Sequence, residues 1–298
     1  MRIDRFLEQK DDDQKKTMVV CAADDYEVLS CINEVLKRGL CNCILVGNKE
    51  NIHRITAKLG IDISECNIVD SVDEADSAEK SISLIREEQA NVLMKGGILT
   101  RTLMRAILDK EKGIRGGLLN SVCAIDCPKL DRIIYLSDPG IIAFPTLEQK
   151  VDIINSTVSF VRKLGVNIPK VAVVSAVEII NPALPSTLDA AVLALMGQRG
   201  QFKDCIVDGP LAFDNALFSE AVEHKNVTSP VDICGKADIV IMPNAECGNG
   251  IMKAIRFMTD SATAGVLLGA KVPIVMTSRA DSAINKLRSV GLALSASD

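Results

Sequence analysis

The sequence predicts an α/β protein of two doubly wound domains with mostly parallel sheets. Short apolar runs of strand length alternate with amphipathic runs of helical spacing along almost the whole chain. A length of 298 residues with 48% hydrophobic composition is enough to bury two cores. Because open α/β folds place their chemistry in loops that follow strands, we expect the active site in a cleft between the two domains.

The first half of the chain opens as a strand-helix-strand unit after a polar segment at 8–16. The expected strands are 17–23, 43–46, 91–94, 119–124 and 132–136. The expected helices are 26–38, 51–59, 77–88 and 100–109. The turn Lys95-Gly96-Gly97 joins an apolar strand to a helix, so it belongs to the edge where ligands are expected.

A domain boundary is expected near Pro145, because Pro and Gly residues interrupt the pattern there and a long helix follows at 147–164. The expected strands of the second half are 170–174, 204–207, 239–242 and 272–276. The expected helices are 188–196, 215–224, 251–264 and 281–290. The final helix returns to the first domain, so the predicted domains are 1–145 plus 279–298 and 146–278.

Composition narrows the classes of function. A net charge of −5 argues against a general nucleic-acid binder, so any anion site must be a local group of arginines. The ten cysteines and two histidines lack the spacing of a zinc site, and no metal is expected. The start is charged and no run approaches 18 uninterrupted apolar residues. We expect a cytoplasmic protein with reduced thiols and no membrane contact.

Two polar loops near the carboxyl end concentrate reactive side chains. The loop at 243–250 opens a helix on which Asn249 and Arg256 share a stripe. The loop at 277–282 contains two types of hydroxyl group, a guanidinium and a carboxylate, which together can bind an anion and move a proton. A local alternative is that Ser278 and Asp281 form a capping box. Likewise, Arg256 could be a solvated arginine on an amphipathic helix.

Cys247 lies in the first of these loops, and we interpret it as a buried small hydrophobe rather than a nucleophile. The turn Lys95-Gly96-Gly97 could bring backbone N–H groups close to a phosphate at the start of a helix that also carries Arg101 and Arg105. The alternative is a glycine turn beside two exposed arginines. No G-x-G-x-x-G or Walker A pattern supports dinucleotide or ATP binding.

Several ordered motifs identify a family. They are Leu93-Met94-Lys95-Gly96-Gly97, Leu108-Asp109-Lys110-Glu111, Asn181-Pro182-Ala183-Leu184-Pro185-Ser186-Thr187, Arg199-Gly200-Gln201, Asp208-Gly209-Pro210-Leu211-Ala212-Phe213-Asp214-Asn215-Ala216 and Thr277-Ser278-Arg279-Ala280-Asp281-Ser282. With them the chain resembles the phosphate acetyltransferase and phosphate butyryltransferase family over nearly its whole length, and the butyryl branch more closely. The resemblance implies reversible acyl transfer between coenzyme A and inorganic phosphate by a homodimer without metal or redox cofactor. It also implies a two-domain fold similar to isocitrate and isopropylmalate dehydrogenases.

The resemblance also implies site residues. The family's serine-arginine pair falls on Ser278 and Arg279, and its helix arginine, 22 residues before the serine, falls on Arg256. The family's catalytic aspartate falls on Asn285, so Asp281 is the substitute candidate for the base. The candidate substrate-binding residues are Lys95, Gly96, Gly97, Thr100, Arg105, Asn249 and Thr277.

Two departures from the family pattern keep alternatives open. The chain has Asn120-Ser121 where butyryl-type members usually have Ser-His, and Glu246-Cys247-Gly248-Asn249 where they usually have Glu-Ala-Gly-Asn. The Asn120-Ser121 departure could alter recognition of the acyl group or of phosphate. The alternatives are a phosphate acetyltransferase and a non-catalytic protein that binds coenzyme A or acyl phosphate. A dehydrogenase acting on a 2-hydroxy acid is suggested by fold alone. Acyl chain preference and physiological direction stay open.

Overall fold

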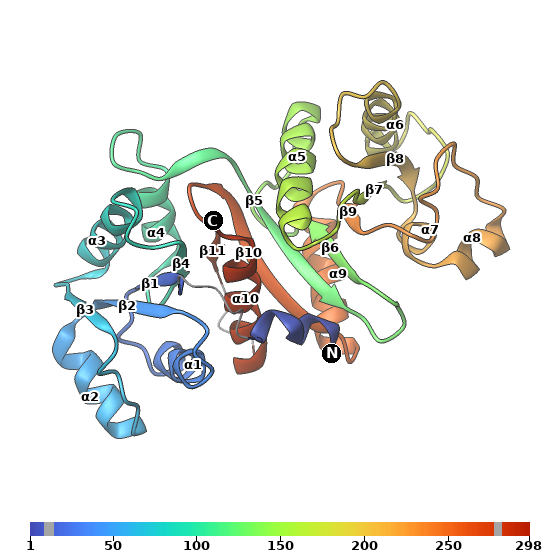
Figure 1. The fold of residues 1–298 in the computed structure, drawn as a ribbon. Coiled ribbons are helices and arrows are strands. Elements are labelled where there is room, and N and C mark those ends of the chain that lie inside the picture. Colours follow the sequence, from blue (N-terminus) through green and yellow to red (C-terminus); the bar gives the residue numbers. More distant parts are fainter. Residues whose placement is uncertain (9–14, 277–281) are drawn as a thin grey trace. The chain divides into compact units, whose positions relative to one another are not determined.

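The computed structural model describes residues 1–8, 15–276 and 282–298 (Figure 1). The chain forms two compact α/β units. The first unit contains Asp4–Leu119 and Ala264–Asp298, and the second contains Met1–Ile3 and Asn120–Thr263. This division differs from the predicted boundaries at 145/146 and 278/279. The physical reason is that the strand after residue 132 pairs with a strand near residue 240, so the residues just before Pro145 belong to the same sheet as residues far beyond it.

The first unit is built around a mostly parallel set of strands. Its strands are β1 (Thr17–Cys21), β2 (Asn42–Gly47), β3 (Asn67–Asp70), β4 (Val92–Lys95) and β11 (Ile274–Val275), with β10 (Ala262–Ala270) entering from the second unit. Its helices are α1 (Tyr26–Lys37), α2 (Lys49–Leu59), α3 (Glu74–Arg86), α4 (Thr100–Ile107) and α10 (Ala283–Ala296), and η1 (Arg2–Leu7) is a 3-10 helix. The strand order is β3-β2-β1-β4-β11-β10, and only the β10–β11 pair is antiparallel.

Local chemistry explains where these helices begin and end. The Asp25 carboxylate accepts the backbone N–H groups of Glu27 and Val28 and so caps the start of α1. The Asn48 side chain caps α2 in the same way, and Gly60 ends that helix at a φ of 64°, where glycine has no steric penalty. Strand β1 is a continuous buried apolar run, as expected for a strand with parallel neighbours on both sides.

The second unit has the strand order β5-β6-β9-β7-β8. Its strands are β5 (Arg115–Asp126, which begins in the first unit), β6 (Ile133–Ser137), β7 (Lys170–Val174), β8 (Ile206–Leu211) and β9 (Ile239–Ile241). Its helices are α5 (Leu147–Lys163), α6 (Pro185–Gln198), α7 (Phe213–Leu217), α8 (Ser219–Lys225) and α9 (Ala245–Met258). The β5–β6 pair is antiparallel and the others are parallel.

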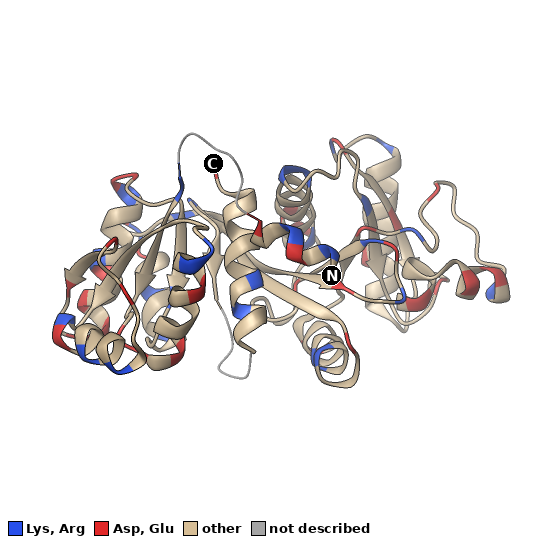
Figure 2. Ribbon diagram, turned by 60° about the horizontal axis from the view of Figure 1, so that its bottom comes forward, with Lys and Arg blue, Asp and Glu red and all other residues tan. Residues whose placement is uncertain are grey.

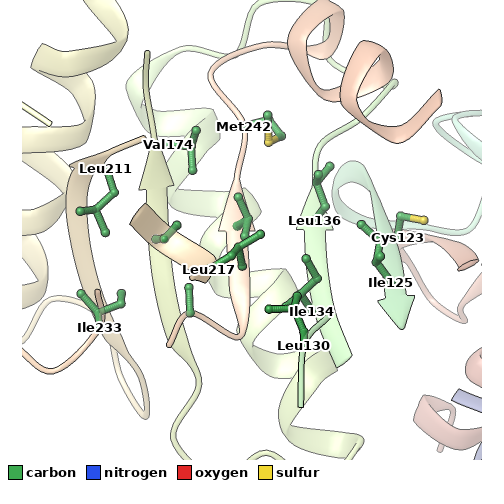
Figure 3. Close-up of a cluster of buried hydrophobic side chains, with 14 of the residues drawn as sticks. Cys123, Ile125, Leu130, Ile134, Leu136, Val174, Leu211, Leu217, Ile233 and Met242 are labelled. Carbon is green, nitrogen blue, oxygen red and sulfur yellow. The ribbon is translucent and has the colours of Figure 1, made fainter. Parts of the chain in front are cut away.

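The core of the second unit lies where β6, β7, β8 and β9 meet the following helices (Figure 3). Leu136, Val174 and Met242 come from three different strands or their ends and contribute to one buried cluster. Met252 of α9 and Leu217 of α7 pack into the same cluster, which places both helices against the sheet. Burial of these apolar side chains is the main favourable contribution to the stability of this unit.

The predicted α/β class with mostly parallel strands is confirmed, while two expected helices differ from the structure and one strand was not predicted. Residues 262–264 belong to strand β10, not to a helix ending at 264, because β10 is hydrogen-bonded into the sheet between β11 and β5. The expected helix at 215–224 is two short helices, α7 and α8. Strand β3 was missed because it is a four-residue edge strand with polar residues at both ends.

Basic and acidic residues are interspersed along the elements of both units (Figure 2). This pattern agrees with the expectation that an anion site, if present, is a local feature. Among the described helices, none combines the length and apolar character needed to span a membrane.

Candidate active site

The segment expected to carry the chemistry lies outside the described residues. Thr277, Ser278, Arg279 and Asp281 all fall within 277–281, and their roles stay predictions. On the far side of this segment, Ser282 is the N-cap of α10 and accepts the N–H of Asn285 at 3.3 Å. The N-cap of α10 is therefore Ser282 and not Ser278, while the capping box expected between Ser278 and Asp281 lies outside the described residues.

Asn285 is the residue on which the resemblance places the family's catalytic aspartate. Its side-chain oxygen accepts a hydrogen bond from Nη1 of Arg288 at 3.1 Å. The guanidinium of Arg288 also binds the Asp4 carboxylate, with Nε 2.7 Å from Oδ1. An amide cannot act as a general base near neutral pH, and the contacts of Asn285 with its own helix and neighbour are structural.

The Lys95-Gly96-Gly97 turn follows β4, which lies between β1 and β11 in the first unit. The Gly96 N–H donates to the Cys21 carbonyl and the Gly97 N–H to the Ala22 carbonyl, each at 2.8 Å. A Cβ on Gly96 would lie 2.2 Å from the Ala22 oxygen. Both amides are therefore bonded to the segment that ends β1, and their contact with a phosphate stays a prediction.

Thr100 and Arg105 lie on α4, directly after this turn. Thr100 is the first residue of the helix and Arg105 lies in its last turn, and both are exposed. Arg105 lines a cavity of about 530 Å³ between α3 and α4, together with Arg86 and Lys112. The structure therefore brings Lys95, Thr100 and Arg105 into one strand-helix connection of the first unit.

Asn249 and Arg256 lie on α9 in the second unit. The loop expected at 243–250 is mostly helical, because the Asn244 side chain caps α9 by accepting the Cys247 N–H at 2.9 Å. Asn249 is exposed, and its Nδ2 donates to the Pro139 carbonyl at 3.3 Å. Arg256 is half-buried, seven residues further along the helix. Seven residues are close to two helical turns, so the two side chains share a face.

Cys247 packs against the hydrophobic core of the second unit. Burial raises the pKa of its thiol, which disfavours the reactive thiolate. Cys247 is partly buried rather than fully buried, and its packing against the core agrees with our interpretation of it as a small hydrophobe. Within the described residues, no group of three His, Cys, Asp or Glu side chains is arranged to hold a metal ion.

The first departure from the family pattern is part of a buried hydrogen-bond network. Asn120 is fully buried, and its Nδ2 donates to Ser137 Oγ at 3.0 Å while its Oδ1 accepts from Ser156 Oγ at 2.8 Å. Ser121 Oγ donates to Asp138 Oδ1 at 2.6 Å. The side chains of Asn120 and Ser121, which differ from the family pattern, are therefore both hydrogen-bonded within the second unit. Asn120 links β5 to β6 and α5.

Asp138 is the residue that reasoning from the sequence missed. The Pro and Gly residues of this region indicate a domain boundary and no site, yet the Asp138 side chain is buried and accepts several hydrogen bonds. The available signal was a carboxylate directly after an apolar strand and directly before Pro-Gly, a position where Asp side chains often bond the following backbone.

The chain shows extensive similarity to known acyltransferases. The family model for phosphate acetyl/butaryl transferase matches residues 2–82 and 74–294. Phosphate butyryltransferase of Clostridium acetobutylicum is 42% identical over 281 residues, covering 94% of this chain and 93% of that protein. Phosphate acetyltransferase of Thermotoga maritima is 40% identical over 278 residues, covering 93% of this chain and 94% of that protein.

A solved structure shows the same fold. The crystal structure of a branched-chain phosphotransacylase from Enterococcus faecalis V583 superposes with a TM-score of 0.85 and 29% sequence identity. The match covers 94% of this chain and 98% of that chain. Motifs, family model, relatives and fold agree over both units, and the chain belongs to the phosphate acetyl/butyryl transferase family.

Proposed function

We propose that this chain is a phosphate acyltransferase that moves butyryl or a similar short acyl group reversibly between coenzyme A and inorganic phosphate. The observation that carries the proposal is 42% identity to a phosphate butyryltransferase over 94% of the chain. That match includes both units, and therefore both groups of candidate residues. A phosphate acetyltransferase is the second candidate, because a relative of that name is 40% identical over a similar length.

The proposed reaction is a direct displacement. The coenzyme A thiolate attacks the carbonyl carbon of the acyl phosphate, the carbon–oxygen bond to phosphate breaks, and the products are the thioester and inorganic phosphate. A thiol with a pKa of about 8.5 needs only modest help from a base, for which Asp281 is the candidate. Ser278 would donate a hydrogen bond to the developing oxyanion.

The arginines have a separate role in this proposal. Arg279 and Arg256 would hold phosphate, since a planar guanidinium can make two parallel hydrogen bonds to phosphate oxygens. Lys95, Thr100, Arg105, Asn249 and Thr277 would contact the substrates through their side chains. We also propose that the enzyme acts in the cytoplasm as a homodimer and needs no metal or redox cofactor.

The test is phosphate-dependent cleavage of acetyl-, propionyl-, butyryl- and isobutyryl-coenzyme A, followed by loss of thioester absorbance so that protein thiols do not contribute. We expect a preference for the four-carbon thioesters and a fall of about 10²–10³-fold in kcat for Ser278→Ala. Ser282→Ala is the matched control, because this neighbouring serine caps α10 and should mainly lose about 1 kcal/mol of stability.

Arg279→Lys separates the two substrates. It keeps the positive charge but loses the planar fork, so the KM for phosphate should rise far more than the KM for the thioester. An unchanged phosphate KM and turnover would rule out this assignment. Cleavage of acetyl-coenzyme A in preference to the others would favour the acetyl branch, and binding of a thioester without cleavage would favour a binding protein.

A further inference from the structure

The loop between β6 and α5 is organised by one buried carboxylate. Asp138 follows the last residue of β6 and is only 3% exposed. Its carboxylate accepts Ser121 Oγ at 2.6 Å and the backbone N–H groups of Gly140 at 3.0 Å and Ile142 at 2.8 Å. The N–H groups of Ser121 and Ile141 add further bonds. Such charge-assisted bonds hold residues 138–142, here called the Asp138 loop, in one conformation.

Helix α9 begins directly on this loop. Asn249 Nδ2 donates to the Pro139 carbonyl at 3.3 Å, and one turn earlier the Ala245 N–H donates to the Ala143 carbonyl at 3.0 Å. Between these two bonds, Gly248 packs with its backbone against the loop. A Cβ there would lie 2.9 Å from Pro139 Cα. The start of α9 is therefore fixed to the Asp138 loop by one hydrogen bond and one close backbone contact, and to Ala143, the residue after the loop, by a second hydrogen bond.

The same helix carries Arg256, the candidate phosphate contact, on the face of Asn249. A rotation or shift at the start of α9 would move the Arg256 guanidinium by a comparable amount, because a helix is rigid over two turns. Displacements of about 1 Å at a reacting group can cost on the order of 10²-fold in rate.

We infer that Asp138 is a positioning residue for phosphate: it holds the loop on which α9 rests and so sets the place of Asn249 and Arg256. Asp138 itself contacts neither substrate. The inference rests on the proposed function, since it needs Arg256 to hold phosphate.

A second buried carboxylate, with no described contact to α9, is available for comparison. Asp126, the last residue of β5, is 2% exposed. Its carboxylate accepts hydrogen bonds from Arg2 Nε at 2.9 Å and from the Ile3 N–H at 3.0 Å. None of its described contacts involves α9. Asp126→Asn and Asp138→Asn each replace a buried, hydrogen-bonded carboxylate by an amide, and both should lower stability.

The experiment compares these two variants in full-length protein, with the KM for phosphate and the KM for butyryl-coenzyme A measured separately. We expect Asp138→Asn to raise the phosphate KM by about tenfold or more and to change the thioester KM by less than about threefold. Asp126→Asn should leave both constants near those of wild type. Equal kinetic constants in the two variants, or an equal rise in both KM values for Asp138→Asn, would overturn the inference.

A second pair keeps the test valid if Asp138→Asn does not fold. Gly248→Ala adds the Cβ that would press on Pro139, whereas Gly250→Ala places a Cβ in open space on the same helix. We expect Gly248→Ala alone to raise the phosphate KM selectively. Wild-type kinetics in both glycine variants would contradict the inference. The proposed function itself is tested first, on the wild-type protein. If the wild-type protein showed no phosphate-dependent cleavage, the proposed function would be overturned before any variant is made.

Discussion

Gly96→Ala should harm this protein far more than Gly97→Ala, although the two glycines are neighbours in one turn. An added Cβ at Gly96 would lie 2.2 Å from the Ala22 carbonyl oxygen and 2.4 Å from that of Cys21, both of them backbone atoms that cannot rotate away. At Gly97 the nearest atom is the Asp25 Cβ at 3.4 Å, an ordinary van der Waals distance. The two substitutions remove the same hydrogen and add the same methyl group.

The size of the difference can be worked out from these contacts. Real Cβ atoms essentially never approach within 3.0 Å of another atom, so the Gly96 turn must move away from β1. That movement stretches the bonds from Gly96 N–H and Gly97 N–H to the end of β1, each now 2.8 Å. Overpacking and two weakened hydrogen bonds together should lower the free energy of unfolding by about 2–5 kcal/mol. Gly97→Ala should change it by less than about 1 kcal/mol.

Urea denaturation of both variants measures this difference, and steady-state kinetics shows whether the displaced turn carries Lys95 and Thr100 with it. We expect Gly96→Ala to raise the KM of at least one substrate, since both side chains are candidate contacts. Equal destabilisation by the two substitutions would refute the steric argument. A larger kinetic effect of Gly97→Ala would instead support the prediction that a substrate phosphate approaches the turn at Gly97.

Asn120→Ala should lower the free energy of unfolding, measured by urea denaturation, by about 1–3 kcal/mol, because the buried hydroxyls of Ser137 and Ser156 lose their hydrogen-bond partner. Unchanged stability together with an altered acyl preference would instead show that Asn120 contacts substrate. The Arg288 hydrogen bond lowers the pKa of Asp4 in the folded protein. The stabilisation of the protein by this pair is therefore fully present above the pKa of Asp4 in the unfolded chain, near 3.8, and is lost as the pH falls through the lower pKa of the folded state. Asp4→Asn should therefore be less stable than wild type at about pH 6, and the gap should shrink below about pH 4; a gap that grows in acid would contradict this. Burial raises the pKa of Cys21 to about 12 and of Cys31 to about 11, so mass spectrometry should find neither modified by a thiol reagent in native protein at about pH 8. Modification of Cys31 as fast as in denatured protein would contradict its burial.

Reasoning from the sequence succeeded where the signal is local. Buried parallel strands such as β1 and β7 are uninterrupted apolar runs, and α5 shows helical spacing after a threonine cap, so each was predicted nearly to its ends. Its errors lie where pairing with distant residues decides the state, as in β10, which lies beside β5 in the sheet and whose small apolar residues fit a helix or a strand equally well.

The candidate site shows the same division. The motifs around Lys95, Arg256 and Ser278 are contiguous strings, and the sequence by itself determined the family and the residue types offered for acyl transfer to phosphate. Only the tertiary structure decided which hydrogen bonds and contacts each of these groups makes. In the folded protein the Gly96 N–H donates a hydrogen bond to the end of β1. Asp138 accepts the hydrogen bonds that hold the loop against which α9 begins. The physical reason is that a hydrogen bond or a steric contact depends on which distant segments the fold brings within a few ångströms, and no local pattern encodes that distance.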